Sequence, residues 1–212
     1  MHVSDGVLSP TVLAAGFAGA IALGAWTMRN VENEEIPKIS VVTAAFFVAS
    51  LIHFPVPGAP FSLHLVLNGL AGVILGTRAF PAVFVGIILQ ALLFGHGGVS
   101  VIGVNTVMMG GGALAAYAVW RLHNRSRSSQ RAAIFGALAG AVGIIVSGMI
   151  LAVALLTTGE AFAATAWAVF VYHIPLMFVE GTVSGACVAF LARVKPALLP
   201  DYRPGHVAHS NR

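Results

Sequence analysis

The stretch AAIFGALAGAVGIIVSGMILAVALL, from Ala132 to Leu156, runs for 25 residues without a charged side chain. A helix needs about 20 apolar residues to cross the hydrocarbon core of a bilayer, which is about 30 Å thick. Of the 212 residues of the chain, 58% are hydrophobic and 8% are charged, whereas about 25% are charged in an ordinary soluble domain. The sequence therefore predicts an integral membrane protein.

Six more apolar segments accompany this stretch, separated by polar or proline-rich breaks such as RNVENEEIPK (29–38) and PVPGAP (55–60), where proline cannot continue a helix. They predict an all-α bundle of about seven transmembrane helices, forming one domain over residues 1–196 with a disordered cytoplasmic tail over 197–212. The third and fourth segments are short, which leaves partial insertion or a broken helix open there. The expected spans are about Ser9–Met28, Ile39–Phe54, Ser62–Gly76, Phe80–Phe94, Val101–Trp120, Ala132–Leu156 and Ala166–Ala192.

The basic residues indicate the orientation of these spans. In a seven-span layout all eleven Lys and Arg residues fall on one side of the membrane, in short tracts between apolar runs. Because cytoplasmic loops carry the excess of Lys and Arg, we expect the N-terminus outside and the C-terminus in the cytoplasm. The same distribution argues against a nucleic-acid partner. The residues are Arg29, Lys38, Arg78, Arg121, Arg125, Arg127, Arg131, Arg193, Lys195, Arg203 and Arg212.

Several classes of chemistry are excluded by what the sequence lacks. Its single cysteine, Cys187, allows neither a disulfide framework nor a CxxC metal site. It has no GxxxxGK[ST] motif, so any ATP-driven step needs another subunit. An intramembrane metal-dependent enzyme built on His173 and Glu180 is the alternative function, but its usual HExxH signature is absent. We therefore expect a protein that is not an enzyme, and we expect His173 and Glu180 to be a buried structural pair.

The N-terminus MHVSDGVLSP carries the clearest candidate site. Initiator methionine is normally removed only before a small residue, so Met1 is expected to stay ahead of His2 and to offer a free α-amine. That amine, the His2 amide nitrogen and the His2 imidazole can close adjacent chelate rings around one metal. A planar nitrogen set suits Ni(II) or Cu(II) and accommodates Co(II). The alternative is that His2 is simply the second residue of a frayed terminus.

MHVSDGVLSP resembles the MHIPDGxLSP start of the substrate-binding membrane component of cobalt and nickel energy-coupling-factor (ECF) transporters, the CbiM/NikM family. Three further segments resemble that family in the same order: FPVPGAPFSLHLVLNGLAGVILG (54–76), QALLFGHGGVSVIGVNTVMMG (90–110) and YHIPLMFVEGTVSGACVAFLARV (172–194). The resemblance covers most of the chain. It implies uptake of cobalt(II) or nickel(II) across a prokaryotic inner membrane, in a context such as cobalamin biosynthesis.

The resemblance also implies a set of site residues and partners. Met1, His2 and His64 would hold the metal, after the N-terminal segment folds into the bundle from the outer face. Asn68, four residues after His64, is expected to share its helix face and orient its imidazole, and Asn105 to shape the pocket. The implied partners are a coupling transmembrane subunit, ATP-binding subunits and a small auxiliary membrane subunit, all within membrane lipid.

Two further features bear on these assignments. His96 stands where the family has the Asp of its GDGG motif, which leaves open an altered entry route or a second metal contact. Small residues crowd the first expected helix, including Ala18 and Ala22. Such faces let helices approach closely within lipid, so they mark a contact inside the bundle or with a partner helix.

Overall fold

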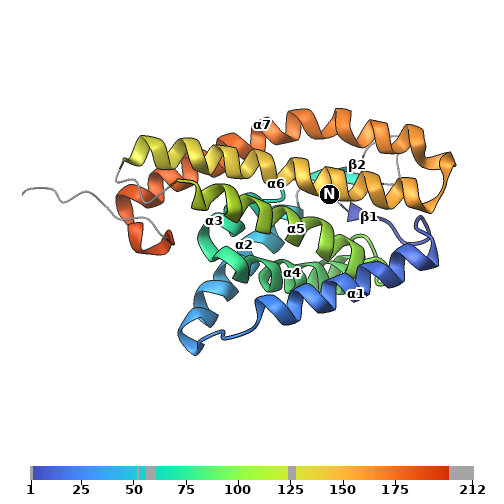
Figure 1. Cartoon of the computed structure of the whole chain (residues 1–212), viewed down its shortest axis with the longest axis horizontal. Coiled ribbons are helices and arrows are strands. Elements are labelled where there is room, and N and C mark those ends of the chain that lie inside the picture. Colours follow the sequence, from blue (N-terminus) through green and yellow to red (C-terminus); the bar gives the residue numbers. More distant parts are fainter. Residues whose placement is uncertain (1, 52, 56–60, 124–127, 201–212) are drawn as a thin grey trace, which may run out of the picture.

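The computed structural model describes residues 2–51, 53–55, 61–123 and 128–200. This part of the chain is mostly helical, with the long helices packed side by side and a small sheet set among them (Figure 1). The helices are α1 (Pro10–Thr27), α2 (Ile36–Leu51), α3 (Asn68–Leu75), α4 (Ala79–Phe94), α5 (Ile102–Arg121), α6 (Ser129–Thr158) and α7 (Ala163–Val194). The strands are β1 (His2–Val3), β2 (His53–Pro55) and β3 (Phe61–His64), and short 3-10 turns occupy Asn33–Glu35, Gly76–Arg78, Glu160–Phe162 and Pro196–Leu198.

Five helical runs in the described residues are long and apolar enough to cross a membrane: Pro10–Thr27, Asn68–Phe94, Ile102–Arg121, Ser129–Thr158 and Glu160–Val194. The 16-residue α2 is shorter than these runs. The expected start of the third span is wrong, because Phe61–His64 forms β3 and the helix begins only at Asn68. The structure is therefore not purely α-helical.

The run from Asn68 to Phe94 reverses direction at Gly76, where φ is +61°. Gly72 lies against Ala113, and Gly76 lies against Tyr117, so α3 follows the direction of α5. Phe80 in turn lies against Gly110, and the segment after α4 reaches Asn105, so α4 runs back along α5. The pair α3 and α4 is thus a helical hairpin, as their shortness in the sequence allowed.

Glycines bring α3 close to α6. A Cβ atom placed on Gly69 would lie 2.5 Å from the Cα of Gly140, which leaves no room for a side chain. Small residues permit such close approach where lipid supplies no hydrophobic driving force between helices. The crossing places the N-terminal end of α3 against α6, a few residues after β3 ends at His64.

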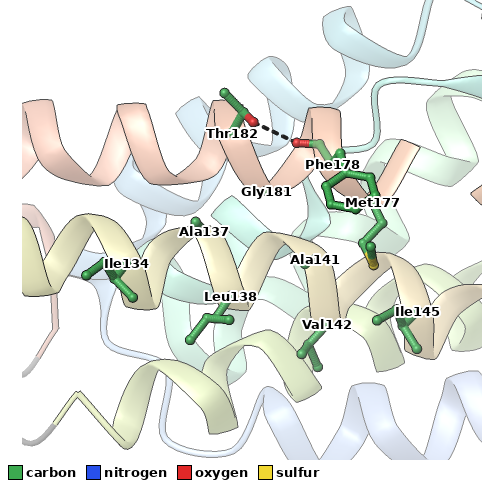
Figure 2. Close-up of a pocket in the computed structure, with 10 residues that line it drawn as sticks. All are labelled: Ile134, Ala137, Leu138, Ala141, Val142, Ile145, Met177, Phe178, Gly181 and Thr182. Carbon is green, nitrogen blue, oxygen red and sulfur yellow. Dashed lines mark hydrogen bonds between the residues drawn. The ribbon is translucent and has the colours of Figure 1, made fainter. Parts of the chain in front are cut away.

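An open apolar groove of about 550 Å³ runs between α6 and α7 (Figure 2). Gly181, Ala137 and Ala141 lie among its lining residues, together with larger apolar side chains such as Phe178. Its polar lining side chain, Thr182, donates its hydroxyl to the carbonyl of Phe178 at 2.8 Å, as the dashed line shows. The groove offers no donor set for a metal ion.

The described basic residues gather at one end of the bundle. Arg78 donates to the carbonyls of Thr27 (2.6 Å), Arg29 (2.9 Å) and Asn30 (2.8 Å) beyond the end of α1. At the same end of the fold, Lys38 donates to the carbonyl of Leu198 at 2.9 Å, and Arg193 to the hydroxyl of Ser129 at 3.3 Å, where α6 begins and α7 ends. Arg125, Arg127, Arg203 and Arg212 lie outside the described residues.

The chain that follows α7 packs back against the bundle as far as residue 200. Pro196–Leu198 forms a 3-10 turn, Leu199 is buried, and the carbonyl of Pro200 accepts a hydrogen bond of 2.9 Å from the indole of Trp120. The remainder of the tail expected over 197–212 lies outside the described residues from 201 onward.

Helix α1 uses one small face inside the bundle. A Cβ atom on Gly16 would lie 2.3 Å from the side chain of Val104, and one on Gly19 would lie 3.2 Å from Val107, so these glycines face α5. Ala18 and Ala22 are exposed on a different part of the helix. The internal contact is therefore made by the glycines, and the two alanines remain available to a partner.

Candidate metal site

Strand β1 lies inside the bundle, next to α5 (Figure 1). The side chain of Asn105 holds it there: its Oδ1 accepts from the Val3 amide at 3.1 Å, and its Nδ2 donates to the Val3 carbonyl at 3.2 Å. Val3 is fully buried, and its backbone groups need such partners away from water. Asn105, which the sequence predicts to shape the pocket, is hydrogen-bonded to the strand that carries His2.

Asp5 provides a second clamp on the N-terminal segment. Its amide donates to the carbonyl of Gly97 at 2.7 Å, while its carboxylate accepts from the amide of Ser100 at 3.1 Å and from the hydroxyl of that serine. A Cβ atom on Gly98, where φ is +112°, would lie 1.9 Å from this carboxylate. The position therefore needs glycine both for its backbone conformation and for space.

A three-stranded antiparallel sheet of order β1-β3-β2 brings the two histidines together. In its register His2 pairs with Ser62, and β3 ends two residues later at His64. Both histidine side chains are only 2% exposed. The Nδ1 of His2 lies 3.0 Å from the Nε2 of His64.

The outer nitrogens of the two rings face carbonyl oxygens. The Nε2 of His2 lies 2.6 Å from the Oε1 of Gln90, and the Nδ1 of His64 lies 3.0 Å from the carbonyl of Leu65. A carbonyl only accepts, so each outer nitrogen carries the proton and each neutral ring presents its lone pair on the inner nitrogen. Two lone pairs therefore converge on one point, which favours a cation there.

The separation of these inner nitrogens fits two ligands of one metal ion. Metal–imidazole bonds of about 2.0–2.1 Å at a right angle place the two nitrogens about 2.9 Å apart, close to the 3.0 Å observed. Carbonyl acceptors on the outer nitrogens are also the usual surroundings of metal-binding histidines. Burial lowers the pKa of His64, which lies outside the helices, to about 4, so the ring is neutral at neutral pH.

Gln90 is a site residue that the sequence analysis did not identify. It is fully buried on α4 and its amide nitrogen donates to the hydroxyl of Ser50, which leaves its oxygen facing His2. The available signal was a glutamine inside an apolar helix, because a polar amide buried in a membrane helix needs partners. Which partners it takes depends on the packing of α2, α4 and β1.

His96 joins the two histidines in one aromatic group. Its ring is nearly parallel to that of His2, with centroids 5.4 Å apart, and its centroid lies 6.5 Å from that of His64. The residue that replaces the family aspartate is therefore next to the site. Among the described residues, no group of three His, Cys, Asp or Glu side chains has the arrangement to hold a metal. Met1 lies outside the described residues.

The expectation that Asn68 shares a helix face with His64 is wrong. His64 ends a strand and Asn68 begins α3. The amide nitrogen of Asn68 donates to the carbonyl of Met109 at 3.1 Å and to the hydroxyl of Ser147 at 2.9 Å. Asn68 thus joins α3 to α5 and α6, while Leu65 takes the outer nitrogen of His64.

His173 and Glu180 are both buried on α7, as expected, but they bind different partners. The Nδ1 of His173 lies 2.5 Å from the carbonyl of Val169, one turn earlier on its own helix. The carboxylate of Glu180 accepts from the backbone amides of Val66 and Leu67, in the segment that follows His64. Glu180 therefore contacts the backbone that supports the site.

Comparison with known proteins finds a family model and relatives that match most of the chain. Residues 2–198 match the family model described as the cobalt uptake substrate-specific transmembrane region. The chain is 34% identical over 201 residues to a putative metal transport protein of Haemophilus influenzae, covering 94% of this chain and 97% of the relative. It is 32% identical over 215 residues to the cobalt transport protein CbiM of Sorangium cellulosum, covering 94% of each.

The similar proteins also include fusions and solved structures. The fused nickel transport protein NikMN of Rhodobacter capsulatus is 33% identical over 161 residues, which cover 72% of this chain and 46% of the fusion. A crystal structure of a transition metal transporter has a TM-score of 0.73 at 22% identity, covering 92% of this chain and 93% of the other. A crystal structure of a truncated transition metal transporter has a TM-score of 0.71 at 20% identity, covering 90% of this chain and 96% of the other. These structures support the fold.

Proposed function

The chain belongs to the cobalt uptake substrate-specific transmembrane family, and from this premise we propose that it captures Co(II) or Ni(II) as the substrate-specific component of an ATP-driven ECF transporter. The observation that carries the proposal is the pair of inward-facing nitrogens on His2 and His64, 3.0 Å apart. Met1 would supply its α-amine, His2 its Nδ1 and its amide nitrogen, which gives up its proton to solvent when the metal binds, and His64 the fourth nitrogen. A planar set of four nitrogens is typical of Ni(II) and is accepted by Co(II).

The ion reaches this site from outside the cell in the proposed orientation. The basic end of the bundle, around Arg78 and Lys38, faces the cytoplasm according to the positive-inside tendency. The N-terminal segment, clamped by Asn105 and the 97–100 loop, closes over the ion. All seven helices take part in crossing the membrane, with α3 and α4 contributing as a hairpin.

Release to the cytoplasm depends on other subunits. The sequence has no P-loop motif, so ATP hydrolysis belongs to ATP-binding subunits that act through a coupling membrane subunit, with a small auxiliary subunit assisting metal loading. Nitrogen donors of this kind do not separate cobalt from nickel, and both ions are proposed cargo.

Isothermal titration of the purified full-length protein with Ni(II) or Co(II) tests the proposal, with any affinity tag at the C-terminus. One ion is expected per chain. His64→Ala should weaken binding by more than the roughly 10- to 100-fold typical of changes beside a ligand. His123→Gln is the matched control, since His123 is equally buried but stacks on Trp120 at the basic end. Unchanged affinity in His64→Ala would refute the proposed site.

A further inference from the structure

Glu180 is an acidic residue in the middle of a membrane helix and is fully buried. Among the described residues no Lys or Arg forms an ion pair with it. Its carboxylate instead accepts from the Val66 amide and, at 3.0 and 3.1 Å, from the Leu67 amide. An ionisable group at such depth is costly and is usually retained for function.

A single peptide unit joins this carboxylate to His64. The amide of Val66, which donates to Glu180, and the carbonyl of Leu65, which faces the Nδ1 of His64 at 3.0 Å, belong to the same planar peptide group. The carboxylate therefore binds one edge of that plane and the imidazole binds the opposite edge. Hydrogen bonds in such a chain polarise one another, more strongly where water is excluded.

The backbone beside this peptide adopts a conformation that the carboxylate stabilises. Leu67 has φ +55° and ψ 15°, a left-handed conformation that non-glycine residues rarely adopt. It turns the chain from β3 into α3, directly after the two amides of Val66 and Leu67 that donate to the Glu180 carboxylate. Consecutive amides in such a turn form a concavity that binds an anion, and here the anion is the Glu180 carboxylate.

We propose that Glu180 is a positioning residue of the metal site, which orients and polarises His64 through the Leu65–Val66 peptide. The inference rests on the proposed function, because it assigns His64 as a metal ligand. The carboxylate strengthens the Leu65 carbonyl as an acceptor, which keeps the proton on Nδ1 of His64 and the lone pair on Nε2. A carboxylate bound directly to a metal-binding histidine acts in the same way, and here one peptide unit is interposed.

The first arm of the test needs no metal. Full-length protein labelled with ¹⁵N-histidine reports the tautomer of His64 by its ring-nitrogen shifts, with the signal assigned by its loss in His64→Gln. The wild type should show the proton on Nδ1. Glu180→Ala should give a mixture of tautomers, and Glu180→Gln, which keeps an acceptor oxygen, should lie between the two. An unchanged His64 tautomer in Glu180→Ala would overturn the inference.

The second arm measures Ni(II) affinity and the ligand-field absorption of the Ni(II) complex. Glu180→Gln should weaken binding about 10-fold and Glu180→Ala about 100-fold, both with a shifted absorption band. Ser184→Ala is the matched control, because Ser184 is also fully buried one turn further along α7 and its hydroxyl has no hydrogen-bond partner in the described part of the chain. It should leave affinity and spectrum unchanged.

The outcomes separate the two proposals. If both Glu180 variants lose thermal stability in detergent but keep the wild-type tautomer, affinity and band, Glu180 is only structural and the inference fails. If the wild type binds neither Ni(II) nor Co(II) while the tautomer changes as described, the peptide relay to His64 stands and the proposed function fails.

Discussion

The Nε2 of His2 lies 2.6 Å from the Oε1 of Gln90, across 88 residues of sequence. The amide nitrogen of the same Gln90 donates to Ser50, so the side chain cannot turn its nitrogen toward His2 without breaking that bond. Three elements, β1, α4 and α2, thereby set the tautomer of one imidazole. The consequence is that the inner nitrogen of His2 keeps its lone pair.

Replacing Gln90 should weaken metal binding without removing a ligand. Gln90→Met has a similar volume but cannot accept from His2, so the proton is no longer held on Nε2. We expect Ni(II) affinity to fall by about 10- to 100-fold in isothermal titration. Thr106→Val is the control, because Thr106 is also fully buried but lies outside the site. Equal affinities for Gln90→Met and the wild type would contradict the tautomer argument.

One extra residue ahead of Met1 should abolish high-affinity binding. The α-amine of Met1 is one peptide unit from His2, and an added residue turns that amine into an amide while leaving every side chain intact. Titration with Ni(II) should show the loss in the extended protein but not in a protein lengthened at its C-terminus. If the extended protein binds as tightly, the amine is not a ligand and the site must be completed by other groups, such as His96.

The exposed face of α1 that carries Ala18 and Ala22 should affect assembly with the coupling subunit rather than folding. Ala18→Leu and Ala22→Leu alter exposed positions, so we expect wild-type thermal stability and Ni(II) affinity but weaker co-purification with the coupling subunit. Gly16→Leu should lower thermal stability, because a Cβ there would lie 2.8 Å from the Val104 backbone nitrogen. If Ala18→Leu and Ala22→Leu both co-purify normally with the coupling subunit, the docking surface lies elsewhere.

Reporter fusions should reveal the orientation of the bundle. A reporter fused after Arg125 is expected in the cytoplasm, and one inserted at Glu160 outside, because the basic residues mark the inner side. Alkaline phosphatase and green fluorescent protein fusions read the two locations with opposite signals. The reverse pattern would move the histidine site to the cytoplasmic face and contradict uptake from outside.

The sequence predicted the long helices well because long charge-free runs and charged breaks determine them. The match between expected and observed α6 illustrates this, since Ala132–Leu156 lies wholly within Ser129–Thr158. The start of α3 could not be found in this way. Residues from Phe61 onward are as apolar as a membrane helix, and it is pairing with β1 and β2 on its two sides that makes Phe61–His64 a strand.

The sequence indicated which two histidines lie together, but not the groups around them. His2 and His64 do lie together. Asn105, on α5, holds strand β1, which carries His2, by its hydrogen bond with Val3. Gln90 and Glu180 act through hydrogen bonds whose partners are distant in sequence, so no spacing pattern indicates them. A spacing of four residues would put Asn68 on the same face as His64 only within a continuous helix. The left-handed conformation of Leu67 instead turns the chain between the two residues.

Strand β1 is synthesised well before α5, because its partner Asn105 lies 102 residues after Val3. Because a chain is made from its N-terminus, the histidine pocket cannot close until α5 has been inserted. Until then His2 lacks the neighbours that bury it in the finished fold. The pairing of β1 with β3 and α5 is therefore a late event in folding, although β1 is made before either of them.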